Sequence, residues 1–325
     1  MAATCSRKEL AIPAIEPDAA RLGNPALRYF LATRPPFVTV TLLSGVIGLA
    51  SAYASGVAVH PLTAIITLIF IAVAQGGFNV LNDYYDAQSG TDGANSERIY
   101  PYTGGSRFIQ NGILTPAQTL AYGIALLVAT MIAGLWLTAE SDAGLLLIGA
   151  TGLLIGWAYS APPIALNSRG LGEACLLIGF LIVAVGADFV QRAELAALPL
   201  EAGLSFALLV VCILYINQFP DRAADAAAGK RHLVVRLAPA QARWGYPLLA
   251  SAAYLWLIGA VIAGVLPWPA LIALAPAVLT LRATKILFAH SSSPAQLAPA
   301  LPMTIAAATA HGVLLTVAMV LSRML

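Results

Sequence analysis

The carboxylate and amide side chains of this chain concentrate in two short segments. The first contains Asn82, Asp83 and Asp86, with Asp92 a few residues later. Asp83 and Asp86 are three residues apart, so on a helix both carboxylates would project from one face, within reach of one cation. A single acid at the end of a membrane helix could instead be a solvated terminus.

The second segment contains Asn217, Asp221 and Asp225 at i, i+4 and i+8, a ladder that rises about 6 Å at each step on a helix. Five of the 15 acidic residues of the chain fall in the two segments. Acids clustered beside apolar runs are costly and usually mark functional sites. Carboxylate and amide oxygens suit Mg²⁺, which bridges protein carboxylates to substrate phosphates. We therefore predict a magnesium site built by both segments.

Basic residues follow each acidic segment and indicate which anion would accompany the metal. The candidates for direct contacts to a diphosphate are Arg98, Arg107, Lys230 and Arg231. Each of them alone could be a positively charged anchor at a membrane surface. An anion site that opens from an apolar bundle predicts an amphipathic substrate with a diphosphate head and a long hydrocarbon tail.

The composition shows what kind of element must position these groups. Apolar residue types make up 59% of the 325 residues and charged types only 10%, against about 25% charged residues in soluble domains. The net charge of +2 and the lack of a clustered basic surface exclude nucleic acid as an expected partner. The predicted partner is the lipid bilayer, and no motif calls for a partner protein.

Nine apolar runs have the length of bilayer-crossing helices, which need about 20 residues. They cover residues 36–54, 61–85, 116–139, 143–160, 171–191, 203–219, 245–265, 269–289 and 299–322. Charged residues interrupt the first 35 residues, so no cleavable signal peptide is predicted. We expect a cytoplasmic or interfacial segment over residues 1–35 and one all-α transmembrane domain over residues 36–325.

The positions of Lys and Arg predict the orientation. With nine spans and the N-terminus inside, 15 of the 17 basic residues fall on the inner side, and only Arg192 and Arg323 fall on the outer side. Cytoplasmic loops retain positive charge, so we expect the N-terminus inside and the C-terminus outside. Both acidic segments then face the cytoplasm, beside the long connections 86–115 and 220–244, in a protein of the cell (inner) membrane.

Other function classes leave different signatures. The three cysteines contain no C-x-x-C pair, so disulfide and zinc frameworks are not expected. The chain contains no Walker loop for ATP. A secondary transporter would also carry acids in a helical bundle, but near the bilayer midplane within broken helices, whereas these acids gather at one end. The transporter stays open as the alternative from a different class.

The N-D-Y-Y-D segment at 82–86, the ladder at 217–225 and the nine runs around them resemble the UbiA superfamily of membrane prenyltransferases. The resemblance implies a helical bundle around a central cavity and Mg²⁺-dependent transfer of a polyprenyl group from its diphosphate to an acceptor. It implies catalytic roles for Asp83 and Asp221. Tyr159 matches the family's position for an aromatic residue that stabilises the prenyl cation, although a tyrosine of the interfacial belt is the other interpretation.

Within the superfamily, the chain is most similar to the branch that prenylates 1,4-dihydroxy-2-naphthoate in menaquinone synthesis. Gly90 with Asp92 two residues later, the run from Arg98 to Gly112 and the segment 228–237 carry this resemblance. It implies an aromatic acceptor that loses its carboxylate as carbon dioxide. Another acceptor, such as 4-hydroxybenzoate, is the alternative. Glu173 and Asp92 are weaker candidates for acceptor binding.

Overall fold

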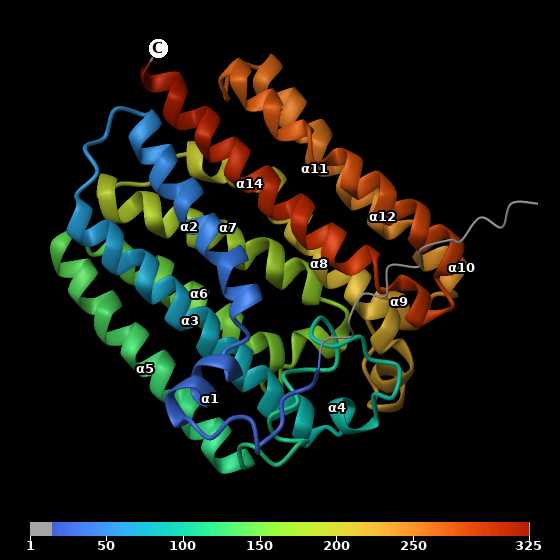
Figure 1. Ribbon diagram of the computed structural model, residues 1–325. Coiled ribbons are helices and arrows are strands. Elements are labelled where there is room, and N and C mark those ends of the chain that lie inside the picture. The colour runs from blue at the N-terminus through green and yellow to red at the C-terminus, as the bar shows by residue number, and fades with distance from the viewer. Residues whose placement is uncertain (1–14, 325) are drawn as a thin grey trace, which may run out of the picture.

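The computed structural model describes residues 15–324, and this part of the chain is helical without strands. Figure 1 shows long helices running across the molecule, with the short helices gathered at one end and the C-terminal end of the chain at the other. The predicted all-α fold is therefore confirmed. The part of the N-terminal segment before residue 15, with Arg7 and Lys8, lies outside the described residues.

The long helices follow the predicted apolar runs. They are α2 (Pro35–Ala54), α3 (Pro61–Gln88), α5 (Pro116–Glu140), α6 (Gly144–Ser160), α7 (Gly172–Arg192), α8 (Leu198–Ala227), α11 (Gly245–Ile262), α12 (Ala277–His290), preceded by the 3₁₀ helix η2 (Trp268–Leu274), and α14 (Ala300–Met324). Within the described residues, eight helical segments are long and apolar enough to cross a membrane, and α6 is a shorter apolar helix of 17 residues. The count of nine spans and their orientation stay predictions.

The short helices lie in the connections. They are α1 (Pro25–Ala32), α4 (Thr91–Ala94), η1 (Leu166–Arg169), α9 (Leu233–Arg236), α10 (Pro239–Ala242) and α13 (Pro294–Leu297). Proline begins α2, α3 and α5, where its missing N–H is not needed by the helix. At the start of α5, Thr115 and Gln118 also form a reciprocal capping box.

Both acidic segments lie on the last turns of long helices. The helix α3 continues through Asp86 to Gln88, and α8 continues past the predicted end of its apolar run to Ala227. Pro220 lies inside α8 without ending it, although proline removes one backbone hydrogen bond of the helix. The two helices therefore carry their carboxylates beyond the apolar core to one end of the bundle.

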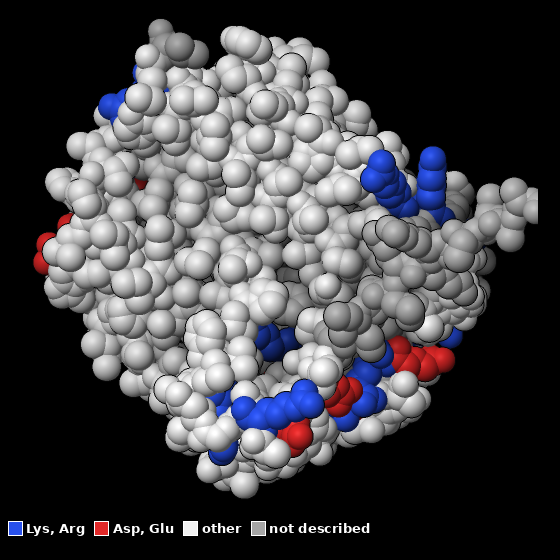
Figure 2. All heavy atoms as spheres, in the orientation of Figure 1, with Lys and Arg blue, Asp and Glu red and all other residues white. Residues whose placement is uncertain are grey.

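The distribution of charged side chains on the surface also separates one charged end from an apolar middle. In Figure 2, many Lys, Arg, Asp and Glu side chains gather along the lower rim and a few more lie at the left, upper left and right edges, while the broad middle of the visible face is almost free of charge. Large apolar side chains such as Leu147, Leu248 and Ile262 are exposed on the helices, as expected where lipid replaces water. The protein is a multi-pass membrane protein.

Candidate functional site

A cavity of ≈ 640 Å³ runs through the bundle from the charged end. Its polar part is formed by the ends of α3 and α8 and by the α3–α5 connection (residues 89–115). Its apolar part continues between α3, α5, α6 and α7, where Phe78, Gly149 and Ala187 are among the lining residues. The cavity therefore combines a charged mouth with a hydrocarbon-like interior.

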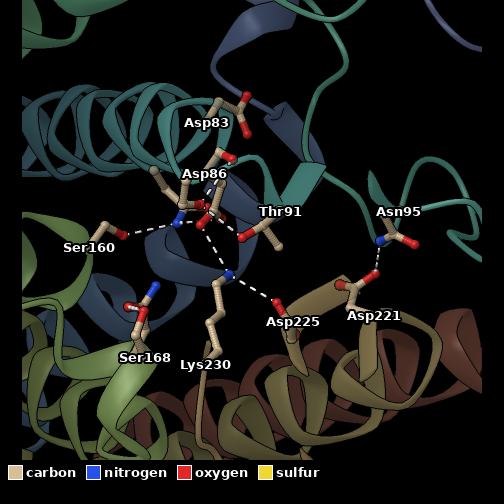
Figure 3. A network of polar contacts seen from close by, with 12 residues as sticks. Asp83, Asp86, Thr91, Asn95, Ser160, Ser168, Asp221, Asp225 and Lys230 are labelled. Carbon is tan, nitrogen blue, oxygen red and sulfur yellow. Dashed lines mark hydrogen bonds and ion pairs between the residues drawn. The ribbon is translucent and has the colours of Figure 1, made fainter. Parts of the chain in front are cut away.

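Lys230 joins the two acidic segments at this mouth. Its Nζ lies 3.0 Å from Asp86 Oδ1 and 3.0 Å from Asp225 Oδ1, as Figure 3 shows. The other oxygen of the Asp225 carboxylate lies 3.0 Å from His232 Nε2. Segments 139 residues apart in the chain thus meet across one ammonium group.

Asn82 braces the first segment. Its Nδ2 donates to Asp86 Oδ2 at 3.1 Å and to the Ser160 hydroxyl at 2.9 Å. These two bonds fix the Asp86 carboxylate and tie α3 to the end of α6. The amide nitrogen is occupied, so its oxygen is the atom left for a cation.

The second segment presents all three predicted residues to the cavity. Asn217, Asp221 and Asp225 line it, so the ladder lies on one face of α8 as its spacing indicated. Asn95 of the α3–α5 connection donates to Asp221 Oδ1 at 2.5 Å. Asn217 donates to the Tyr102 carbonyl at 3.3 Å, and its Oδ1 is buried without a hydrogen-bond partner within the described residues.

Asp83 is placed differently from Asp86. Positions three apart on a helix differ by about 60° around its axis, and only Asp86 lines the cavity. The Asp83 carboxylate instead accepts from the backbone N–H of Ser106, at 3.2 and 3.3 Å for its two oxygens. In Figure 3 it lies apart from the contacts of Lys230.

Two consecutive glycines of the α3–α5 connection, Gly104 and Gly105, both have positive φ and allow the backbone to approach Asp83 closely. Gly105 has a φ of +73°, and a Cβ there would lie 2.3 Å from Asp92 Oδ2 and 3.1 Å from Asp83 Oδ1. Only glycine combines this conformation with such close contact. The connection therefore wraps over two carboxylates, those of Asp83 and Asp92.

The electrostatics of the mouth favour a bound cation. Burial, together with the charges of Asp86 and Asp83, raises the pKa of Asp92 to about 8. Burial opposes the charge of Lys230, but the carboxylates of Asp86 and Asp225 outweigh it and raise the pKa of the lysine. An additional positive charge beside Asp92 would relieve the repulsion between these acids.

The other predicted diphosphate ligands do not line the cavity. Arg98 Nε lies 2.7 Å from Glu16 Oε1, and Arg107 Nε lies 3.7 Å from Glu16 Oε2. Arg231 is exposed, and its backbone N–H donates to the Ser168 carbonyl at 2.7 Å. Of the four predicted cations, only Lys230 is brought to the acids of the cavity.

Arg34 also lines the cavity, although no sequence pattern marked it as a site residue. It precedes α2 in a left-handed conformation, with a φ of +58°, and its side chain is 16% exposed. Within the described residues, its guanidinium donates no hydrogen bond to the protein and lies 3.8 Å from Asp83 Oδ1 and 4.6 Å from the Phe37 ring centre. The unusual backbone conformation and the unused donors are visible only in the structure.

The remaining candidates lie around the transition from polar to apolar lining. Tyr159, at the end of α6, lines the cavity. Glu173 does not line it, but its Oε1 accepts from Gln218 Nε2 at 2.9 Å, and Gln218 does line it. Gln218 is a second cavity residue that the spacing of the acids did not predict, although its position next to Asn217 in the chain was a signal.

The donor set fits Mg²⁺ when a phosphate completes it. Within the described residues, no three His, Cys, Asp or Glu side chains form a metal site by themselves. Mg²⁺ commonly takes one or two carboxylates, waters and substrate phosphates, so a partial protein site is what this metal requires. The unpartnered Asn217 oxygen and the ammonium held between Asp86 and Asp225 both show that the mouth favours a cation.

The sequence model of the UbiA prenyltransferase family matches residues 41–308. The chain belongs to the UbiA prenyltransferase family. It is therefore a membrane prenyltransferase, and the family match decides against the transporter alternative.

Relatives of this UbiA protein include a naphthoate octaprenyltransferase and a naphthoquinone phytyltransferase. It is 27% identical to the 1,4-dihydroxy-2-naphthoate octaprenyltransferase of Bacillus subtilis, over 73% of this chain and 74% of that one. It is 28% identical to the 2-carboxy-1,4-naphthoquinone phytyltransferase of Synechocystis, over 77% of this chain and 80% of that one. The fold is similar to a UbiA homologue from Archaeoglobus fulgidus bound to DMAPP and Mg²⁺, with a TM-score of 0.62 and 17% identity over 89% of this chain and 99% of that one.

Proposed function

We propose that this UbiA protein transfers a polyprenyl group from its diphosphate to 1,4-dihydroxy-2-naphthoate, at the mouth of the cavity. The observation that carries the proposal is the meeting of the α3 and α8 acids across Lys230, directly above an apolar cavity. A charged head and a hydrocarbon tail would each find a matching environment there. The naphthoate and naphthoquinone enzymes among its relatives support the acceptor.

Mg²⁺ would be held by oxygens from both helices. We assign Asp86, Asn217, Asp221 and Asp225 to it, with the Asn82 oxygen as a further ligand. Asp83 would bind the metal, and so act in catalysis, only after its carboxylate moves away from the backbone N–H of Ser106. When bound, the metal would neutralise charge on the departing diphosphate. The Mg²⁺-bound homologue of the same fold supports this assignment.

Lys230 and Arg34 would supply the direct cationic contacts to the diphosphate. Both line the cavity, and the guanidinium of Arg34 has its N–H donors available within the described residues. An arginine can bind a phosphate through two parallel hydrogen bonds, whereas a lysine acts as a compact charge. Arg98, Arg107 and Arg231 would need to leave their present contacts or surroundings to take part.

Below the diphosphate, the apolar wall would hold the prenyl tail and keep water from the allylic cation. The face of the Tyr159 ring would stabilise that cation, since this residue stands where the polar lining ends. The acceptor would approach from the side of Glu173, Gln218 and Asp92. Loss of its carboxylate as carbon dioxide restores the aromatic ring after attack, so no strong base is required at the attacked carbon.

We also propose that residues 1–35 form a cytoplasmic or interfacial segment before the membrane domain 36–325. The mouth of the cavity would face the cytoplasm in the cell (inner) membrane, with the C-terminus outside. The 15-to-2 distribution of basic residues supports this orientation. Cysteine replacements of Ser96 and Ala226 should then resist labelling from outside intact cells, and their ready labelling would contradict it.

The acceptor is tested with naphthoate labelled in its carboxyl carbon. Membranes containing the protein, Mg²⁺ and a polyprenyl diphosphate should release the label in step with prenyl transfer. Prenylation that retains the label, or transfer to 4-hydroxybenzoate with naphthoate ignored, would overturn the acceptor and leave the prenyltransferase assignment intact.

A further inference from the structure

The chain before α1 crosses the α3–α5 connection. We call residues 15–24 the N-terminal strap. Leu22 of the strap is 7% exposed and belongs to the same apolar cluster as Phe108, Ile113 and Leu114 of the connection. The strap precedes residues 41–308, the part matched by the family. The family match therefore says nothing about the role of the strap.

Glu16 is the charged contact between the strap and the connection. Its Oε1 lies 2.7 Å from Arg98 Nε, and its Oε2 lies 3.4 Å from Asn111 Nδ2 and 3.7 Å from Arg107 Nε. Asn111 also donates to the Pro17 carbonyl at 2.9 Å. One carboxylate thus gathers three side chains of the connection.

The ionised form of Glu16 is the one that these contacts stabilise. Burial opposes its charge, but the hydrogen bonds from Arg98 and Asn111 hold the pKa of this carboxyl below its usual value. Arg107 has a φ of +68°, and its Nε is buried without a hydrogen-bond partner within the described residues. The nearby charge of Glu16 therefore compensates an arginine held in a strained conformation.

Arg98 and Arg107 each contact Glu16 on one side and a backbone carbonyl near the mouth of the cavity on the other. Arg98 donates to the Asn95 carbonyl at 2.6 Å, and the Asn95 amide donates to Asp221. Arg107 donates to the Asp92 carbonyl at 2.5 Å. Asn95 and Asp92 both line the cavity, whereas neither arginine does. The arginines thus hold the connection from behind.

We propose that Glu16 is a positioning residue: by fixing Arg98 and Arg107, it holds Asn95 and Asp92 in place against the catalytic mouth. The proposal rests on the placement of Asp221 in the metal site. In this proposal, Arg98 and Arg107 hold the α3–α5 connection in place and do not bind the diphosphate. The competing interpretation is a switch in which Glu16 occupies the arginines until a diphosphate displaces it.

The first test compares Glu16→Gln with Asp18→Asn in steady-state kinetics. Asp18 lies in the same strap and caps the backbone N–H of Ala20 at 3.0 Å, so it is a matched control for loss of one negative charge. We expect Glu16→Gln to lower kcat by about tenfold, the equivalent of losing one charge-assisted hydrogen bond, without raising the KM for the prenyl diphosphate. Asp18→Asn should leave both constants unchanged.

Glu16→Asp keeps the charge and should recover part of kcat, which a loss of folding alone would not predict. Arg98→Gln should lower kcat similarly, and the double variant with Glu16→Gln should be no worse than either single variant. Glu16→Gln with normal or raised activity would overturn the proposal, as would a lower KM for the diphosphate. Inactivity of the unaltered protein itself would count against the proposed function and not against Glu16.

The second test asks whether the strap stays closed during turnover. Cysteines at Pro17 and Asn111 would join the strap to the connection in a chain whose Cys5 is replaced by Ser, since Cys175 and Cys212 are buried. The oxidised and reduced forms of this one protein should be equally active if Glu16 only positions. Activity that returns only on reduction would show that the strap must open, and would overturn the proposal in favour of the switch.

Discussion

The interior of the bundle is filled by side chains on one side and contains a cavity on the other. Around α8, α11, η2, α12 and α14, a large cluster of buried side chains fills the interior. Between α3, α5, α6 and α7, the interior is a cavity instead, and glycines such as Gly149 leave open space where a side chain would project. We call these the packed side and the cavity side. The candidate site lies on the cavity side, and α8, which carries the second acidic segment, also packs against α11 and α14 of the packed side.

Buried polar groups show the same contrast. On the packed side, His311 is fully buried and satisfied, with Ser205 Oγ 2.9 Å from Nε2 and the Ala273 carbonyl 2.8 Å from Nδ1. At the mouth of the cavity, Asp92 Oδ2 and Asn217 Oδ1 are buried without hydrogen-bond partners within the described residues. A buried oxygen without a hydrogen-bond partner can still accept a donor or contact a cation, so these two atoms are available to a bound cation.

The largest expected effect is on α8. Asp221→Asn preserves side-chain volume but removes a charge facing the cavity, so prenyl transfer should fall at least about a hundredfold. The control is Asp142→Asn, because Asp142 is exposed and caps the backbone N–H of Gly144 at 2.8 Å. Radiolabelled prenyl transfer in membranes with equal amounts of protein measures both. Near-normal activity of Asp221→Asn would remove α8 from the metal site.

Lys230→Gln should have the next largest effect. It removes the cation held between Asp86 and Asp225, and a hydrogen bond to a charged group contributes about 1.5–3 kcal/mol. The KM for the prenyl diphosphate should therefore rise by about tenfold or more, as measured over a range of diphosphate concentrations. A KM that does not change would mean that Lys230 only spaces the two carboxylates.

Gly149→Leu should make the protein favour a short prenyl diphosphate over a long one. The new side chain would enter the apolar part of the cavity, where a Cβ meets no atom within 4 Å. Transfer from a long polyprenyl diphosphate should fall by about tenfold relative to geranyl diphosphate. Gly259→Leu is the matched control, since Gly259 of α11 also has open space around it but lies outside the cavity lining. Equal loss with both donors would place the tail elsewhere.

His311→Leu should leave catalysis unchanged and lower stability. The substitution is apolar and leaves the Ser205 hydroxyl and the Ala273 carbonyl without their partner, at a cost of about 1–3 kcal/mol. Thermal unfolding in detergent should show a lower Tm, while activity per folded molecule stays constant. A lost activity with an unchanged Tm would break the division between the packed side and the cavity side.

The long helices could be predicted from the sequence, because a helix that crosses lipid requires a long apolar run with defined ends. The ladder Asn217, Asp221 and Asp225 was also predictable, since spacing of four residues fixes one face of a helix. Spacing alone did not show that Asp83 and Asp86 separate, because the rotation of α3 depends on its neighbours. The contacts of Arg34 and Glu16 depend on backbone conformation and on segments far apart in the chain, so no local pattern reported them.

The central claim is that acids from both α3 and α8 bind one metal ion together with the diphosphate. Mn²⁺, a paramagnetic substitute for Mg²⁺, can be titrated into the purified protein in nanodiscs with geranyl diphosphate and followed by electron paramagnetic resonance. Asp86→Asn and Asp221→Asn should each weaken Mn²⁺ binding by about ten- to a hundredfold, while His311→Leu should leave it unchanged. Unaltered Mn²⁺ affinity in either aspartate variant would contradict a site shared between the two helices.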